Sequence, residues 1–162
     1  MVSTLKWLKK KLIQRENGII LDENDSDSFD IIQGFIESKD RPFQTPIIYY
    51  QAFPEESAVD FLNTLKLELI SKLNKPELES SQNLGQIVEI AQLQMIIIDR
   101  CYLQPLDTLQ NLLEFFDSHN VAVVLVGSRT KMEIAQILDL TAVSQWDKLV
   151  GCDDCRDRIT PK

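Results

Sequence analysis

The sequence has 162 residues, of which 44% are hydrophobic and 26% are charged, a composition typical of one folded domain and not of a disordered chain. Its 17 basic and 25 acidic side chains give a formal net charge of -8, and so acidic a surface repels nucleic acid unless a local basic patch overrides the repulsion. No apolar run approaches the roughly 20 residues that span a bilayer. Lys9, Lys10 and Lys11 interrupt any apolar signal-peptide core, so the sequence predicts a cytoplasmic protein with no membrane partner.

The first predicted element is an amphipathic helix over residues 4–14, within an N-terminal segment of residues 1–17. Leu5, Leu8 and Leu12 recur at helical spacing on its apolar side. A solvated helix face explains its lysines, but the cluster is also a candidate surface for nucleic acid. The candidate contact residues are Lys6, Lys9, Lys10, Lys11 and Arg15.

Alternating strands and helices follow. Apolar runs beside turn signals predict strands at residues 19–21, 47–50, 95–98, 121–126 and, at one edge, 148–150. Apolar residues at helical spacing predict helices at 29–36, 55–72, 84–91, 105–116 and 132–138, with a polar loop at 75–81. The buried side of the helix at 55–72 is expected to carry Val59, Leu62, Leu65, Leu69 and Leu73.

This alternation decides the fold class. Strands joined by helices pair in parallel through right-handed crossovers, and near-continuous apolar strands are buried on both faces. The sequence therefore predicts an α/β protein, a three-layer α/β/α sandwich with a mostly parallel five-stranded sheet. This core spans residues 18–151, and residues 152–162 form a C-terminal tail.

Three of the strands carry a resemblance to a known family. The run IIID at residues 96–99 ends in a carboxylate, the run VAVVLVGS at 121–128 ends in glycine and a small hydroxyl residue, and TPIIYY at 45–50 precedes both. They resemble the Walker B, sensor-1 and second strands of AAA+ P-loop ATPases, and in particular of the TnsC/TniB family, which regulates DNA transposition. The resemblance extends over residues 4–150 and implies a P-loop NTPase fold. Since the sequence ends at Lys162, we expect no lid domain.

In that family the phosphate loop has the pattern G-x-x-x-x-G-K-[ST], which falls here on residues 21–28. Leu21 replaces the first glycine, Ser26 the second and Asp27 the lysine, so that Ser28 alone keeps its residue type. Like charges about 4 Å apart near a protein surface repel by roughly 4 kcal/mol, which exceeds the ~0.3–1 kcal/mol that a helix N-terminus offers an anion. We therefore predict that nucleoside triphosphate does not bind, and we expect no cofactor.

The resemblance assigns further positions, and most of them depart from the pattern. Asp99 keeps the Walker B carboxylate, but Arg100 stands where the family has a water-activating glutamate, and arginine cannot act as that base. Ser128 keeps a sensor-like polar role, whereas residues 143–148 contain none of the family's trans-acting arginines. The sequence thus predicts a degenerate AAA+ core, a pseudo-ATPase that binds a protein partner, either itself or an active AAA+ relative.

Alternative functions stay open at this point. A divergent metal-dependent ATPase would use Asp99 and the carboxylates of residues 22–27, and a nucleic-acid accessory protein would use the basic helix. Residues 22–27 also resemble the start of a calcium loop, but Asp27 stands where that loop needs glycine and Gln33 where it needs glutamate, so we expect no metal.

The cysteines offer a further alternative. Cys152 and Cys155 form a C-x-x-C pair, and a structural zinc site would need two more ligands, for which Cys101 and His119 are candidates. Two reduced surface thiols are the simpler expectation, because nothing in the sequence brings the four residues together.

Overall fold

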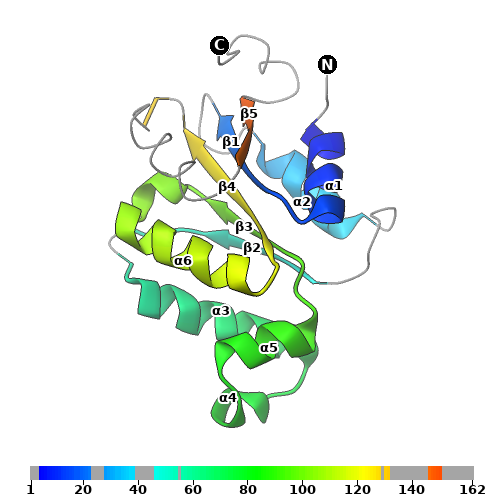
Figure 1. Ribbon diagram of the computed structural model, residues 1–162, viewed down its shortest axis with the longest axis vertical. Helices are drawn as coiled ribbons and strands as arrows, with labels where there is room; N and C mark the ends of the chain where they lie inside the picture. Colours follow the sequence, from blue (N-terminus) through cyan, green and yellow to red (C-terminus); the bar gives the residue numbers. More distant parts are fainter. Residues whose placement is uncertain are drawn as a thin grey trace.

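The computed structural model describes residues 4–22, 28–38, 46–54, 56–128 and 130–131, and the backbone of residues 146–150. Its helices are α1 (Thr4–Gln14), α2 (Phe29–Glu37), α3 (Ala58–Leu73), α4 (Leu78–Ser81), α5 (Leu84–Ala91) and α6 (Leu106–Ser118), with a short 3-10 helix, η1, at Cys101–Leu103 (Figure 1). Its strands are β1 (Asn17–Asp22), β2 (Ile47–Gln51), β3 (Met95–Asp99), β4 (Ala122–Ser128) and β5 (Trp146–Val150). The helix predicted at 132–138 lies outside the described residues. Within the described ranges, no helix is long and apolar enough to cross a membrane.

The five strands form one sheet in the order β2-β3-β4-β1-β5, and every neighbouring pair is parallel. The first strand of the sequence therefore lies inside the sheet, with Gly18 opposite Val124 of β4 and Asp147 of β5. The predicted edge strand at 148–150 is confirmed and begins two residues earlier, at Trp146.

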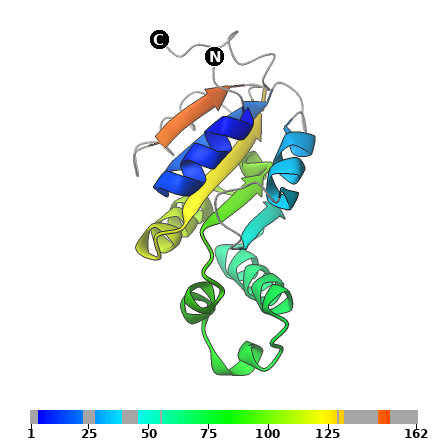
Figure 2. The same cartoon turned by 90° about the vertical axis from the view of Figure 1, so that its right-hand side faces the viewer.

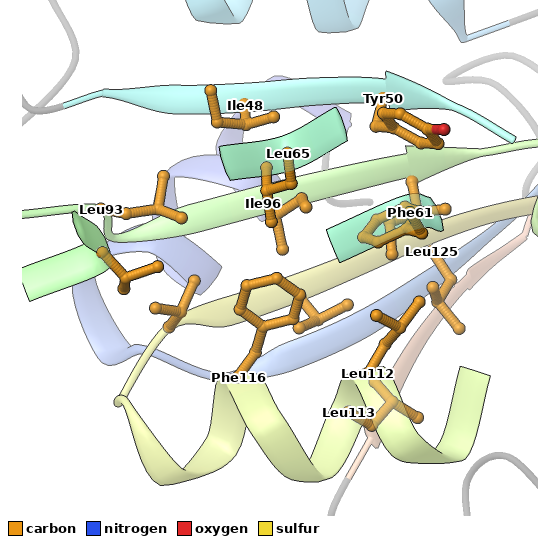
Figure 3. Close-up of a cluster of buried hydrophobic side chains, with 14 of the residues drawn as sticks. Ile48, Tyr50, Phe61, Leu65, Leu93, Ile96, Leu112, Leu113, Phe116 and Leu125 are labelled. Carbon is orange, nitrogen blue, oxygen red and sulfur yellow. The ribbon is translucent and has the colours of Figure 1, made fainter. Parts of the chain in front are cut away.

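Buried side chains of β1 to β4 alternate between two hydrophobic clusters, one on each face of the sheet. One cluster joins the strands to α3, α5 and α6, and the other joins them to α1 and α2 (Figure 2). In β3, Ile96 and Ile98 face the first cluster, whereas Met95 and Ile97 face the second. Figure 3 shows the first cluster, in which Phe116 of α6 points toward the strands. The predicted three-layer α/β/α sandwich is confirmed.

The helix α3 differs from its prediction in where its buried side lies. Phe61, Leu65 and Leu69 are fully buried at four-residue spacing, whereas Val59 is 67% exposed. Successive residues of a helix are turned by about 100°, so Val59, two positions before Phe61, points away from the sheet. The expectation that Val59 is buried was wrong, and the polar loop expected at 75–81 contains the short helix α4.

The helix α1 has its predicted bounds but a different buried side. Leu8 and Leu12 lie in the core as expected, whereas Leu5 is 37% exposed. Lys11 is 0% exposed because it shares the buried side with these leucines, and its Nζ lies 3.6 Å from Glu16 Oε2. The aliphatic stem of a lysine can fill such a position while its charge is paired. The prediction that Lys11 is a candidate nucleic-acid contact was therefore wrong.

Candidate functional site at the carboxyl edge of the sheet

The carboxyl ends of all the strands meet at one edge of the sheet, because the strands are parallel. There Asp99 of β3 lies opposite Gln51 of β2, and Asp22 of β1 lies opposite Ser128 of β4. Because side chains alternate along a strand, these four polar residues belong to the sheet face that α1 and α2 cover. In open α/β sheets this edge is where ligands bind.

Asp22 is 1% exposed, and its Oδ2 atom accepts two hydrogen bonds from Ser28. The Ser28 backbone N–H donates one at 3.1 Å and the Ser28 hydroxyl donates the other at 2.8 Å. Ser28 occupies the N-cap position of α2, yet its side chain makes no capping bond, because the hydroxyl is directed to Asp22. A carboxylate of the chain itself thus accepts an N–H group at the start of the helix that follows β1, the kind of group that binds phosphate in P-loop proteins.

The second carboxylate of the site, Asp99, is 4% exposed, and both of its oxygens accept hydrogen bonds. The Tyr49 hydroxyl donates to Oδ2, and the Arg100 backbone N–H donates to Oδ1 at 2.8 Å. Burial raises the pKa of Tyr49, and the hydrogen bond to Asp99 and the charges of Asp99 and Asp22 raise it further, against an opposing effect of Arg100. The Tyr49 ring meets the ring of Phe29, the first residue of α2, edge to face at 5.7 Å between centroids. Tyr49 therefore links Asp99 to the start of α2.

Arg100 is directed toward β2. With the Gln51 amide oriented so that its oxygen faces Arg100, the Arg100 Nε and Nη1 atoms lie 3.3 and 3.1 Å from that oxygen. The backbone of Arg100 is in the left-handed region, with φ of 52°, which is uncommon for a residue with a side chain. Arg100 thus links the carboxyl end of β3 to that of β2.

The remaining predicted positions are occupied by local contacts or by the core. Ser128 is 1% exposed, and its Oγ lies 3.0 Å from Thr130 Oγ1 and accepts the Thr130 N–H at 3.3 Å. Leu21 is 5% exposed and packs in the cluster with α3, α5 and α6, on the sheet face opposite to Asp22. Residue 21, which the resemblance to the TnsC/TniB family matches with the first glycine of the phosphate loop, therefore lies within β1. Ser26 and Asp27 lie outside the described residues.

The basic residues of the N-terminal segment are spread over different surroundings. Lys6 and Lys10 are exposed and Lys9 is half-buried on the outer side of α1. Arg15 lines a cavity of about 350 Å³ with His119 and Asn120 at the amino end of the sheet. Its partial burial there lowers the pKa of its guanidinium group. Of the predicted basic contact residues, only Lys6, Lys9 and Lys10 thus lie together on the outer side of α1.

The zinc alternative finds no support in the described part of the chain. Cys101 lies two residues after the end of β3 and His119 three residues before the start of β4, so that they lie at opposite ends of the sheet. Burial and the charge of Asp99 raise the pKa of the Cys101 thiol to about 12, which disfavours the thiolate that binds metal. No group of three or more His, Cys, Asp or Glu residues that could hold a metal ion occurs among the described residues. Cys152 and Cys155 lie outside them.

Sequence reasoning missed the tyrosines of β2. Tyr49 binds Asp99 on one face of the sheet, and on the other face the Tyr50 hydroxyl donates to Glu56 Oε2. Glu56 Oε1 also accepts from Gln104 Nε2 at 2.9 Å, so this carboxylate joins the region before α3 to the segment before α6. The available signal was a pair of tyrosines at the end of an otherwise apolar strand, since a buried tyrosine hydroxyl needs a partner.

The fold is similar to that of known proteins, although the sequence is not. No protein-family model matches the sequence, and no curated protein matches it. A chain of the Drosophila ORC assembly bound to AT-rich DNA and Cdc6 superposes with a TM-score of 0.55 at 11% identity, over 91% of this chain and 52% of that chain. The Aeropyrum pernix ORC1 protein in complex with DNA gives a TM-score of 0.54 at 12% identity, over 93% of this chain and 45% of that chain. The protein thus spans about half the length of these neighbours, and it shares their α/β fold over that part.

Proposed function

We propose that this protein is an AAA+-fold pseudo-ATPase, which does not use ATP and acts by binding a protein partner. The observation that carries the proposal is the double hydrogen bond from Ser28 to the buried Asp22 carboxylate. An incoming phosphate group would have to displace that carboxylate from the start of α2, and the two negative charges would repel each other in a site of low dielectric.

The environment of Asp99 supports the same proposal. In phosphoryl-transfer sites Mg²⁺ is held by one or two carboxylates together with substrate phosphates. Here each Asp99 oxygen already accepts a hydrogen bond, one from the Tyr49 hydroxyl and one from the Arg100 N–H, so a metal ion would have to compete with these donors for the carboxylate. Arg100 supplies no base in place of the glutamate that activates water in an active enzyme.

The proposed partner is an active AAA+ ATPase, and the sequence indicates its setting. A core that keeps the fold but does not use nucleotide is suited to bind beside an active AAA+ ATPase and to regulate it. The resemblance of residues 45–50, 96–99 and 121–128 to the TnsC/TniB family favours a transposition-type ATPase or a DNA-associated complex as that setting.

The proposal is tested by calorimetric titration of the whole protein with ATP and Mg²⁺, followed by a phosphate-release assay. We expect no heat of binding up to millimolar nucleotide and no turnover. Asp99→Asn and the matched exposed variant Asp107→Asn on α6 separate a site effect from a charge effect. Micromolar binding with turnover that Asp99→Asn abolishes and Asp107→Asn preserves would falsify the proposal in favour of a divergent metal-dependent ATPase.

A nucleic-acid accessory function is the second candidate. It is favoured by the exposed Lys6 and Lys10 and by the DNA bound to both structural neighbours, and it is weakened by the burial of Lys11 and the acidic total charge. If it is correct, duplex DNA is retarded at low salt, and the affinity falls steeply with salt and with Lys6→Ala and Lys10→Ala. Unchanged DNA mobility at low salt argues against it.

A further inference from the structure

A cavity of about 350 Å³ lies at the amino edge of the sheet, where the strands begin. Two of the residues that line it are Gln94, which directly precedes β3, and Asn120, which lies two residues before β4. Asp22 and Asp99 end their strands, so the cavity lies at the opposite edge from the candidate site. Its volume is within the range of pockets that hold small organic molecules, roughly 300–1,000 Å³. Six of its eight lining residues are polar, so a ligand would be recognised through hydrogen bonds and charge.

Three of the lining residues follow the carboxyl ends of helices. Arg15 directly follows α1, Gln92 directly follows α5, and Asn120 lies two residues after α6 (Figure 1). All three have a left-handed backbone, with φ of 55°, 55° and 56°, at a place in the chain where glycine is usual because it has no Cβ. The chain therefore places three polar residues at the cavity although their backbone favours glycine. The carboxyl end of a helix also carries partial negative charge, which favours a cationic group beside it.

Arg15 and Glu89 bring opposite charges to the wall of the cavity. Among the described residues the Glu89 carboxylate forms no ion pair, so the two charges are not paired with each other. Arg15 already takes part in an interaction within the chain. A guanidinium group has five N–H donors, so it can hold a carboxylate in addition. A ligand that carries both charges would therefore pair with both side chains at once.

Gln94 supplies an acceptor that lacks a donor. Its Oε1 atom is buried and accepts no hydrogen bond from the described part of the chain. An unsatisfied buried acceptor destabilises the protein, and an ammonium group offers three donors. Because the last side-chain torsion of a glutamine is soft, this oxygen can turn toward the cavity that Gln94 lines. The unsatisfied oxygen thus favours a ligand with an ammonium group.

We propose that this cavity binds a small zwitterion, a free amino acid, whose carboxylate pairs with Arg15 and whose ammonium group lies between Glu89 and Gln94. The apolar residues of the wall, Val88 and Leu93, contact the carbon atoms of the ligand. The site goes beyond the proposed function, because it lies at the other edge of the sheet and involves neither nucleotide nor a protein partner. A ligand that binds the folded chain alone also raises its stability in proportion to the logarithm of the ligand concentration.

Titration of the whole ¹⁵N-labelled protein, followed by NMR, tests the site. The probes are glycine, β-alanine and γ-aminobutyrate, in which the distance between the two charges increases, and the single-charge controls are acetate and ethylammonium. We expect at least one zwitterion to shift the side-chain amide signals of Gln92, Gln94 and Asn120 in a saturable way, and each control to bind about tenfold more weakly. If none of the zwitterions shifts these signals, or if acetate or ethylammonium binds as tightly as the best zwitterion, the proposal is overturned.

Variants of the wall separate the site from a general charge effect. Arg15→Gln should lower the affinity for the best zwitterion about tenfold and Glu89→Gln about fivefold. The matched controls, Lys10→Gln on the outer side of α1 and Asp107→Asn at the far end of α6, should leave the affinity unchanged. Gln94→Leu should weaken binding without lowering the midpoint of thermal unfolding of the free protein, since it removes an unsatisfied acceptor. Equal losses in the controls would overturn the site, and the proposed function would still stand as long as ATP is not bound.

Discussion

The Asp22 carboxylate holds the start of α2 through one backbone and one side-chain hydrogen bond from Ser28. Removal of a buried acceptor leaves its donors unsatisfied, which costs about 1–3 kcal/mol, whereas loss of one hydrogen bond costs about 1 kcal/mol. We therefore expect Asp22→Ala to lower the free energy of unfolding by more than Ser28→Ala does, in urea denaturation of both variants. Equal losses would mean that the carboxylate stabilises nothing beyond the hydroxyl bond.

The tyrosines of β2 make a prediction for alkaline solution. Burial and a neighbouring carboxylate raise the pKa of Tyr49 and of Tyr50 above the ordinary value of 10.0. The stabilisation that this gives is fully present below pH 10 and is lost as the pH rises through the raised folded-state values. The free energy of unfolding should therefore fall above pH 10, and it should fall less steeply in the Tyr49→Phe, Tyr50→Phe variant. If the free energy of unfolding fell equally steeply with pH in the two proteins, the raised pKa values of Tyr49 and Tyr50 would be contradicted.

At the scale of the element, replacing each of two helical glycines by alanine should change the free energy of unfolding in opposite directions. A Cβ on Gly34 in α2 would meet no atom within 4 Å, whereas a Cβ on Gly85 in α5 would lie 2.8 Å from His119 Nε2. His119 cannot move away cheaply, because its Nδ1 lies 2.9 Å from the carbonyl oxygen of Phe115. Gly34→Ala should stabilise the protein by about 0.5–1 kcal/mol, and Gly85→Ala should destabilise it by about 1–3 kcal/mol.

Thermal unfolding of four variants measures the effect: Gly34→Ala, Gly85→Ala, His119→Ala and the double variant at positions 85 and 119. Once His119→Ala has removed the imidazole, Gly85→Ala should become neutral or stabilising. A loss that persists in the double variant would show that the close approach of α5 to the end of α6 does not depend on the ring.

Elements with strong periodicity could be predicted from the sequence, whereas side-chain partners could not. The bounds of α1 and α5 and the strands around Ile97 and Val124 follow from local apolar patterns, which are readable because both sheet faces are buried. The burial of Lys11 was not predictable, since a lysine on the apolar side of a helix looks like one on the polar side until its pairing with Glu16 is known.

The candidate site was predictable in its place but not in its contacts. The positions of Asp99 and Ser128 at strand ends could be assigned from resemblance. The bonds from Tyr49 to Asp99 and from Ser28 to Asp22 depend on how α2 packs against the sheet, which no local pattern encodes.

At the scale of the whole molecule, the order of the strands predicts how stability is distributed. β3, β4 and β1 are paired on both sides, whereas β2 and β5 lie at the edges with a neighbour on one side. Amide hydrogen exchange should therefore be slowest in β4 and its two neighbours and faster in both edge strands. Protection in β5 equal to that in β4 would contradict this distribution.

The position of β1 in the sheet also constrains how the chain is made. Gly18 pairs with Val124, 106 residues later, and the side chain of Asn17 bonds the Val123 N–H across the same span. A ribosome adding 5–20 residues per second needs about 5 to 20 seconds to supply the partner of a strand already synthesised. Through that interval the apolar β1 segment awaits its neighbour, so nascent chains cut short before residue 122 should be substrates for chaperones and not early versions of the finished sheet.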